Sequence, residues 1–481
     1  MENSKKTGQS VLPERLPMSA FEEYMYLDSQ PGYPMDCHTR LCWNGRFSHT
    51  DIEQAVAEAL RYHPLLSSHC VSTRRGRPAW QLSADTEIVS DDVCSRVHGI
   101  RICWAKGKCR EAYPAEVKPP IDMDAETPLR IVVLEEVDAA GDVIRTDWFF
   151  KFHHSMADAL GMMRFTQDLM ICYALRTGAN PAIWADYEWP DLSLLLTRGK
   201  CGRNTWGWIK IYLTSRWWLR RSMMFLFRRL LPMAKNAPKE ITRHLDAQYP
   251  ARFFECLSVE KTAHWMARCR ELNGTLNDFL LHASYMAMAQ WRAEHPENAF
   301  PGSGALRIAI PTNLRNAALK RLPATNTVSM VFMDRKPTAV NASQAFFDGI
   351  RQEMLDVKRW ELGFMLVRGI MDARNIHILK WAIQWRNCWA SLVLTNVGRV
   401  LDAKFFPFTR NAQNQILLDG AVLEQLEGAS PIRPLTSVTL CAMTYAGQIQ
   451  LTLFYDSRLL TEELAADFFQ RVQKNMDELL A

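Results

Sequence analysis

The sequence has no long hydrophobic run. None of its apolar stretches reaches the roughly 18 uncharged residues of a membrane-spanning helix, so we expect no membrane span. The first ten residues, MENSKKTGQS, are polar and lack the apolar core of a signal peptide. These absences predict a cytoplasmic protein, and they leave open peripheral contact with the inner face of a membrane.

Metal-binding and redox motifs are also missing. The chain has 12 cysteines, but the closest pairs, Cys37/Cys42 and Cys103/Cys109, do not have the CxxC spacing of a zinc site or a redox dithiol. We therefore expect buried or idle thiols in a reducing compartment and no metal site. The net charge is only +5 over 481 residues, which argues against the dense basic face of a nucleic-acid-binding protein.

Internal repeats and low-complexity tracts are absent too, which excludes a solenoid. A chain of 481 residues is too long for one ordinary core, and its 48% apolar and 23% charged residues are normal for a globular protein. Strand-like and helix-like segments recur in both halves. This pattern predicts two α/β domains of similar build, residues 1–190 and 246–481, joined by a basic segment, residues 191–245.

Short apolar runs and helical periodicity locate the individual elements. Strands are expected at 36–43, 129–134, 148–153, 306–311, 327–332 and 392–395, with a hairpin formed by 437–445 and 448–455. Helices are expected at 157–174 and 276–291. Two more are expected, one that begins at a capping box at residues 50–53 and one that Thr461 caps.

The segment His153-His154-Ser155-Met156-Ala157-Asp158 lies where an expected strand ends and an expected helix begins. Adjacent histidines on extended backbone point to opposite faces, so only one can face a given cleft. They rarely bind one metal ion together, and no third ligand occurs at metal spacing. A neutral imidazole can take the proton of an attacking hydroxyl or amine, because its reference pKa of about 6.5 is near the working pH. Asp158, at the helix start, can bind backbone N–H groups or an arginine.

Short signatures accompany this motif in a fixed order. They are Ala59–Leu66 (ALRYHPLL), Thr127–Arg130 (TPLR), His153–Asp158, Thr275–Asp278 (TLND), Pro311–Arg315 (PTNLR), Thr325–Ser329 (TNTVS) and Thr395–Gly398 (TNVG). Together, over about Leu16 to Ala481, they resemble the condensation-domain and wax-ester-synthase branches of the CoA-dependent acyltransferase superfamily. The resemblance implies two chloramphenicol-acetyltransferase-like domains arranged as a V around a central tunnel, which donor and acceptor enter from opposite faces.

The same resemblance implies roles for individual residues. His154 would be the general base, supported by His153, and Asp158 would be structural and paired with Arg315. The residues implied in substrate binding are Ala159, Gly161, Asn313, Arg315, Asn326, Ser329, Thr395 and Asn396. Ala159 replaces the glycine usual in the superfamily, and its methyl group could narrow the channel beside the base.

The implied reaction needs no cofactor beyond its donor substrate. That donor would be an acyl-CoA or an acyl-carrier-protein thioester, and the acceptor an alcohol, a lipid or an amine. We expect a free-standing enzyme, because no carrier-protein or adenylation domain follows the last helix. The alternative is a catalytically degenerate relative that binds acyl thioesters or a protein partner.

The basic segment has an unusual composition. Residues 198–239 contain eleven Lys or Arg and no Asp or Glu, interleaved with Trp206, Trp208, Trp217 and Trp218. As a helix over 206–231, such a segment can lie in a bilayer interface that contains anionic lipid. The alternative is an interdomain helix whose arginine stems cover apolar surface. The sequence favours neither interpretation.

Overall fold

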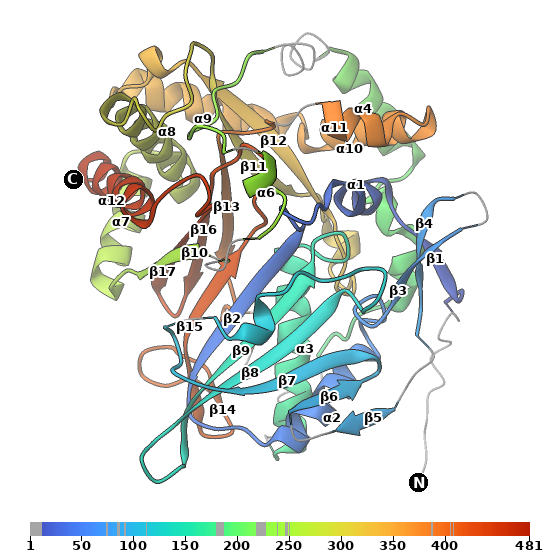
Figure 1. The fold of residues 1–481 in the computed structure, drawn as a ribbon. Coiled ribbons are helices and arrows are strands. Elements are labelled where there is room, and N and C mark those ends of the chain that lie inside the picture. The colour runs from blue at the N-terminus through green and yellow to red at the C-terminus, as the bar shows by residue number, and fades with distance from the viewer. Residues whose placement is uncertain are drawn as a thin grey trace.

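The computed structural model describes residues 12–481, except 74–75, 84–86, 91–92, 112, 179–186, 218–227, 238, 246–248, 250, 386–387, 405 and 407. The chain is mixed α/β with two main sheets in different halves of the molecule (Figure 1), which confirms the expected fold class. Within the described residues, no helix is long and apolar enough to cross a bilayer.

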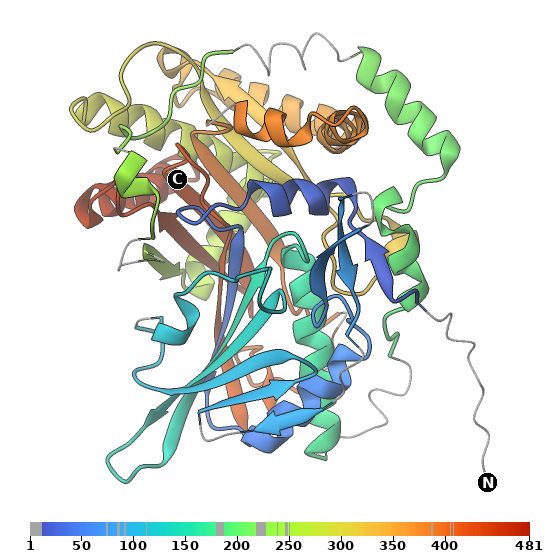
Figure 2. The same ribbon diagram turned by 45° about the vertical axis from the view of Figure 1, so that its right-hand side comes forward.

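The first half is built on an eight-stranded sheet. Its spatial order is β14 (Leu417–Leu418), β15 (Ala421–Ala429), β2 (Asp36–Asn44), β9 (Val143–His153), β8 (Leu129–Val137), β7 (Ile100–Lys106), β6 (Cys94–Val97) and β5 (Ile88–Ser90). Helices α2 (His49–Leu60) and α3 (Ala159–Arg176) pack against one face (Figure 2). A small sheet, β1 (Arg15–Pro17), β4 (Pro78–Gln81) and β3 (His69–Ser72), lies beside it.

The second half is built on a six-stranded sheet. Its order is β10 (Ala251–Cys256), β17 (Gln448–Tyr455), β16 (Val438–Tyr445), β13 (Leu392–Arg399), β11 (Leu306–Asn313) and β12 (Val328–Arg335). Four helices share its hydrophobic core: α7 (Val259–Glu271), α8 (Leu276–Glu294), α9 (Gln344–Arg359) and α12 (Glu462–Leu479). The cap predicted at Thr461 is present, and Thr275 of the TLND signature caps α8.

A separate apolar cluster joins helices from distant parts of the chain. They are α1 (Ala20–Asp28), α4 (Thr205–Trp217), α10 (Gly363–Asn375) and α11 (Leu379–Trp385). Short helical turns complete the structure: η1 (Ala115–Val117), η3 (Leu192–Lys200), α6 (Lys239–Thr242), η4 (Ala317–Leu319) and η5 (Pro337–Ala339).

Two strands from the second half, β15 and the short β14, complete the first sheet. Strand β15 pairs antiparallel with β2, from Val422↔Asn44 to Ala429↔His38. A buried ion network reinforces this junction, because Arg40 binds both Asp147, at 2.6 Å, and Glu427 of β15, at 3.3 Å. The domain boundaries stay a prediction, but residues 421–429 pack with the first sheet.

Several expected boundaries were wrong. Helix α2 is capped by Ser48 rather than Thr50, since the Ser48 hydroxyl already accepts the Asp51 N–H. Strand β13 does not end at residue 395, because a bulge between Asn396 and Gly398 carries it to Arg399. No single helix spans 206–231, because Leu230 forms a β-bridge with Ala305; α4 covers Thr205–Trp217 of this range. Residues 218–227, including Trp218, lie outside the described residues.

Candidate active site

The loop between β9 and α3 carries His154. The main-chain N–H of His154 donates to the carbonyl of Met35, at 2.6 Å, which fixes the loop against the residue preceding β2. The ring Nδ1 lies 3.0 Å from the carbonyl oxygen of Ala157. A carbonyl can only accept a hydrogen bond, so Nδ1 carries the proton and Nε2 has a free lone pair. Burial lowers the pKa of His154 below its usual 6.5, so the ring is neutral at pH 7.

His153 has different surroundings. Its side chain is fully buried, and the Ser155 hydroxyl donates to its Nδ1 at 2.7 Å. Burial lowers its pKa to about 4. His154 is only partly buried, in contrast to the other residues of the loop from 153 to 158. The two adjacent side chains therefore differ in burial, as expected when they point to opposite faces of extended backbone. His154 is the more accessible of the two imidazoles.

Asp158 is the N-cap of α3, and both of its oxygens are occupied. Oδ1 accepts the Gly161 N–H at 2.8 Å, and Oδ2 accepts the Thr327 N–H at 2.7 Å. Arg315 donates to the same Oδ2 at 2.8 Å and, through its other terminal nitrogen, to the Thr325 carbonyl at 2.9 Å. The carboxylate thus ties the histidine loop to the segment 325–327 of the second half.

The segment 324–327 also contacts the histidine loop directly. The side-chain amide of Asn326 donates to the carbonyl of His154 at 2.6 Å. The same nitrogen lies 3.4 Å from His154 Nδ1, but this is not a hydrogen bond, because both nitrogens are donors in this tautomer. Asn326 therefore holds the backbone of the base rather than its ring.

His63 is a supporting residue that sequence reasoning did not assign. Its buried Nδ1 accepts the Ala324 N–H at 2.8 Å, and its Nε2 lies 2.8 Å from the Asp168 carboxylate. It thereby anchors the start of the segment that carries Asn326. Its place in the ALRYHPLL signature was the only signal, because 261 residues separate His63 from Ala324.

The other residues implied in substrate binding do not all contact the histidine loop. Asn313 accepts the Arg315 N–H at 3.0 Å and so supports Arg315. Ala159 is the first residue of α3, and the side chain of Asn396 accepts the Gly398 N–H at the β13 bulge. Ser329 and Thr395 have buried hydroxyls without a hydrogen-bond partner in the described part of the chain. No hydrogen bond among the described residues connects Ser329, Thr395 or Asn396 to His154.

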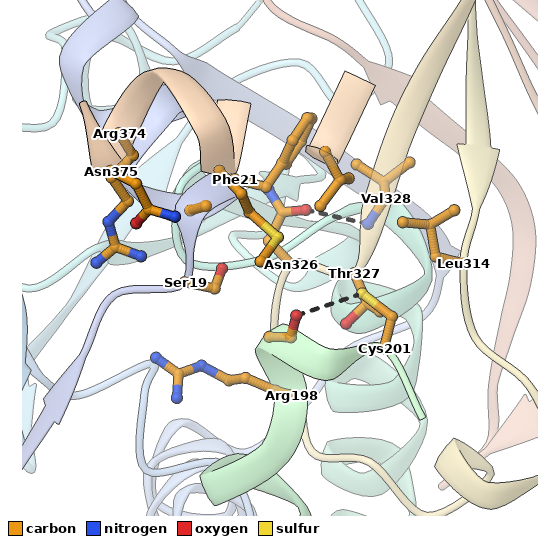
Figure 3. Close-up of a pocket in the computed structure, with 14 residues that line it drawn as sticks. Ser19, Phe21, Arg198, Cys201, Leu314, Asn326, Thr327, Val328, Arg374 and Asn375 are labelled. Carbon is orange, nitrogen blue, oxygen red and sulfur yellow. Dashed lines mark hydrogen bonds between the residues drawn. The ribbon is translucent and has the colours of Figure 1, made fainter. Parts of the chain in front are cut away.

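A pocket of about 150 Å³ lies between α1, η3, α10 and the start of β12 (Figure 3). Its apolar lining includes Phe21, Leu314, Val328, Val367 and Met371, and Asn326 lines it too. The pocket therefore adjoins the residue that holds the His154 backbone.

Two arginines in the pocket wall already have acidic partners. Arg198 binds Glu22 at 2.7 Å, and Arg374 binds Glu23 at 2.6 Å. The wall is consequently not a strongly cationic site. Over the described residues, no three His, Cys, Asp or Glu side chains form a group that could hold a metal ion.

Close packing at Gly161 leads to a stability prediction. A Cβ atom at this position would lie 2.7 Å from the Thr325 carbonyl oxygen, well inside contact distance. We expect Gly161→Ala to destabilise the protein by about 1–3 kcal/mol, as overpacking does, and to lower activity by displacing segment 325–327. Gly349→Ala in α9 is the matched control, because its Cβ would meet nothing within 4 Å. Urea unfolding of both variants checks this, and equal stabilities would contradict it.

Buried histidines predict how stability depends on pH. Burial lowers the pKa of His38, His63, His153 and His154. In the unfolded chain these histidines take up protons near pH 6.5, whereas in the folded chain they stay neutral to lower pH. The free energy of unfolding is therefore highest above pH 6.5 and falls as the pH is lowered. For His153 alone the loss at pH 5.5 is about 1.4 kcal/mol. The melting temperature should drop between pH 7.5 and pH 5.5, where most carboxylates stay ionised; a constant or rising value would refute this.

Comparison with known proteins gives a consistent result for the fold. No family model matches the chain, and no curated protein matches it. Among solved structures, the condensation domain of the Monacolin K polyketide synthase MokA is 12% identical, with 97% of each chain covered and a TM-score of 0.65. A variant of the starter condensation domain of rhizomide synthetase RzmA, in complex with C8-CoA and Leu-SNAC, is 12% identical, with 97% of this chain and 95% of that chain covered and a TM-score of 0.63.

The similarity is not confined to condensation domains. The epimerization domain from the third module of tyrocidine synthetase B is 11% identical, with 98% of each chain covered and a TM-score of 0.64. These likenesses extend over nearly the whole chain at low sequence identity. The chain therefore has the fold of the condensation and epimerization domains of peptide and polyketide synthetases.

Proposed function

We propose that this protein is an acyltransferase that moves an acyl group from a thioester to an alcohol, lipid or amine acceptor, with His154 as the general base. The observation that carries the proposal is the hydrogen bond from His154 Nδ1 to Ala157, which leaves Nε2 as the basic atom. The lowered pKa keeps that atom unprotonated at neutral pH.

The proposed reaction balances without a cofactor. Nε2 of His154 takes the acceptor proton while the acceptor oxygen or nitrogen bonds to the thioester carbonyl carbon. The resulting oxyanion collapses, the C–S bond breaks, and the proton on Nε2 passes to the departing sulfur. The products are the acylated acceptor and a free thiol, and His154 returns to its starting state.

The neighbouring residues act by position. Asp158, Arg315 and Asn326 hold the loop and the backbone of the base, as their hydrogen bonds indicate. Ser329 and Thr395 are proposed substrate contacts, because a bound substrate could satisfy their buried hydroxyls. Ala159 and Asn396 are proposed to line the substrate path, and Gly161 and Asn313 to support its walls.

The donor is proposed to be an acyl-CoA or a carrier-protein thioester. The C8-CoA complex of a structurally similar condensation domain makes octanoyl-CoA the first donor to test. The epimerization domain among the similar structures shows that this fold also serves another reaction, so the fold does not select the chemistry. The competing proposal is a degenerate protein that binds thioesters without consuming them.

Thioester consumption separates these two proposals. Wild-type protein would be incubated with octanoyl-CoA and either a long-chain alcohol or an amine, and the remaining thioester quantified by mass spectrometry. Thiol-reactive dyes are unsuitable, because the chain itself has 12 cysteines. Acceptor-dependent consumption supports catalysis, whereas bound but unconsumed octanoyl-CoA with every acceptor supports the degenerate relative.

A further inference from the structure

Helix α4 carries apolar side chains on two opposite sides. Toward the protein, Trp208 packs against Phe364 of α10, with 5.8 Å between ring centroids, and Ile211 is buried. On the other side, Trp206 is 77% exposed, Leu213 is 57% exposed, and Ile209 is also largely exposed. A surface helix normally has charged or polar residues there. The second apolar side of α4 thus lacks cover within the described chain.

Two more exposed apolar side chains lie in a neighbouring connection. Ile376, which is 65% exposed, and Ile378 lie in the connection from α10 to α11. Arg368 of α10 donates to the Tyr212 carbonyl at 3.2 Å, and Figure 1 shows α4 beside α10. We call Trp206, Ile209, Leu213, Ile376 and Ile378 the outer face.

The charge around the outer face is positive. Lys200 and Lys380, which are close in the chain to α4 and to Ile378, are exposed. The nearby acids are already in ion pairs, Glu361 with Arg203 and Asp372 with Arg368. An exposed tryptophan and aliphatic side chains, surrounded by lysines, fit a bilayer surface with anionic headgroups.

Not every cation of residues 198–239 contributes to this surface. Arg198 is buried against Glu22, and Arg228 binds Asp334 at 3.1 Å. These two arginines form ion pairs within the protein and are not part of the outer face. Lys200, by contrast, is exposed.

One wall of the pocket adjoins the outer face in the chain. Gly199 and Asn375 line it and are exposed, and they immediately precede Lys200 and Ile376 in the chain. Asn326, also in the lining, holds the His154 backbone. The pocket wall therefore includes Asn375, which is next to the outer face in the chain, and Asn326, which holds the histidine loop.

We propose that the outer face docks on an anionic membrane surface and that the pocket receives the alkyl part of an amphiphilic acceptor from that membrane. The docking is independent of catalysis, whereas the delivery of the acceptor rests on the proposed acyl transfer. The proposal thus narrows the acceptor class to membrane-borne alcohols or amines with an alkyl chain.

Co-sedimentation with vesicles tests the docking. Wild-type protein should pellet with phosphatidylglycerol-containing vesicles at low salt, more weakly with phosphatidylcholine alone, and less as salt rises, because surface charges are screened. The variant Trp206→Ser/Ile209→Ser/Leu213→Ser should bind at least 10-fold more weakly. Val137→Ser/Ile144→Ser is the matched control at exposed apolar residues of the β8–β9 hairpin and should bind like wild type. All three proteins should melt at similar temperatures.

Two transfer measurements on the same samples test the delivery. The triple variant should lose transfer to a vesicle-borne long-chain alcohol and keep transfer to a short soluble alcohol. An equal loss with both acceptors would overturn the delivery. Wild-type protein that binds vesicles but transfers nothing would overturn the proposed function and leave the docking intact.

Three results would overturn the docking itself. They are wild-type protein that stays in the supernatant at low salt, a triple variant that pellets like wild type, and sedimentation of wild type as a dimer that the triple substitution converts to a monomer. The last result would assign the outer face to a second copy of the chain.

Discussion

His154→Ala is expected to lower turnover with octanoyl-CoA by about 100-fold or more, the usual effect of losing a general base. The side chain is only partly buried, and its principal hydrogen bond is to the Ala157 carbonyl, so its removal should change the melting temperature little. Turnover measured by mass spectrometry and melting followed by calorimetry check the two halves of this expectation.

His153→Ala is the natural comparison. That imidazole is fully buried and accepts a hydrogen bond from Ser155, so its loss should destabilise the protein more and affect turnover less. If His154→Ala kept near-wild-type transfer, or if His153→Ala alone abolished transfer in a well-folded protein, His154 would not be the base.

Asp158→Asn should lower stability and activity together. The carboxylate accepts from the Gly161 and Thr327 N–H groups and from Arg315. An amide would direct N–H groups toward donors and leave the Arg315 guanidinium without its counter-charge. Breaking one partner of a buried pair costs about 3–5 kcal/mol, and the Asp158 side chain is only 5% exposed. Urea unfolding and steady-state turnover measure the two effects.

Arg315→Lys separates charge from geometry at the same pair. Lysine keeps the positive charge but cannot reach both Asp158 and the Thr325 carbonyl as the guanidinium does. We expect a loss of stability and activity between wild type and Asp158→Asn. Wild-type stability in both variants would show that the pair does not order the loop.

Local patterns in the sequence predicted the frame of the site well. Strand β9 and helix α3 follow an aromatic run and a helical repeat, and Asp158 stands at the N-cap that its position suggested. Cap residues and apolar periodicity act within a few residues, so they can be read without the fold. The misplaced cap of α2 shows the limit of this approach, since Ser48 and Thr50 are both suitable cap residues.

Contacts between distant segments could not be read in this way. The hydrogen bond from Ala324 to His63 and the pairing of β15 with β2 join segments hundreds of residues apart and leave no local pattern. The contact between Asp158 and Arg315 was expected only through the family resemblance. The sequence also did not predict which cations of the basic segment are exposed. Arg198 and Lys200 are close in sequence, but only Arg198 is buried.

The products formed from octanoyl-CoA test the central claim most directly. Wild-type protein would be supplied with octanoyl-CoA and a long-chain alcohol, and free CoA, ester and free octanoate would be quantified over many turnovers. Transfer at His154 predicts equal amounts of CoA and ester, with little octanoate. Recovery of intact octanoyl-CoA from protein that binds it, or release of CoA with octanoate in place of ester, would contradict acyl transfer.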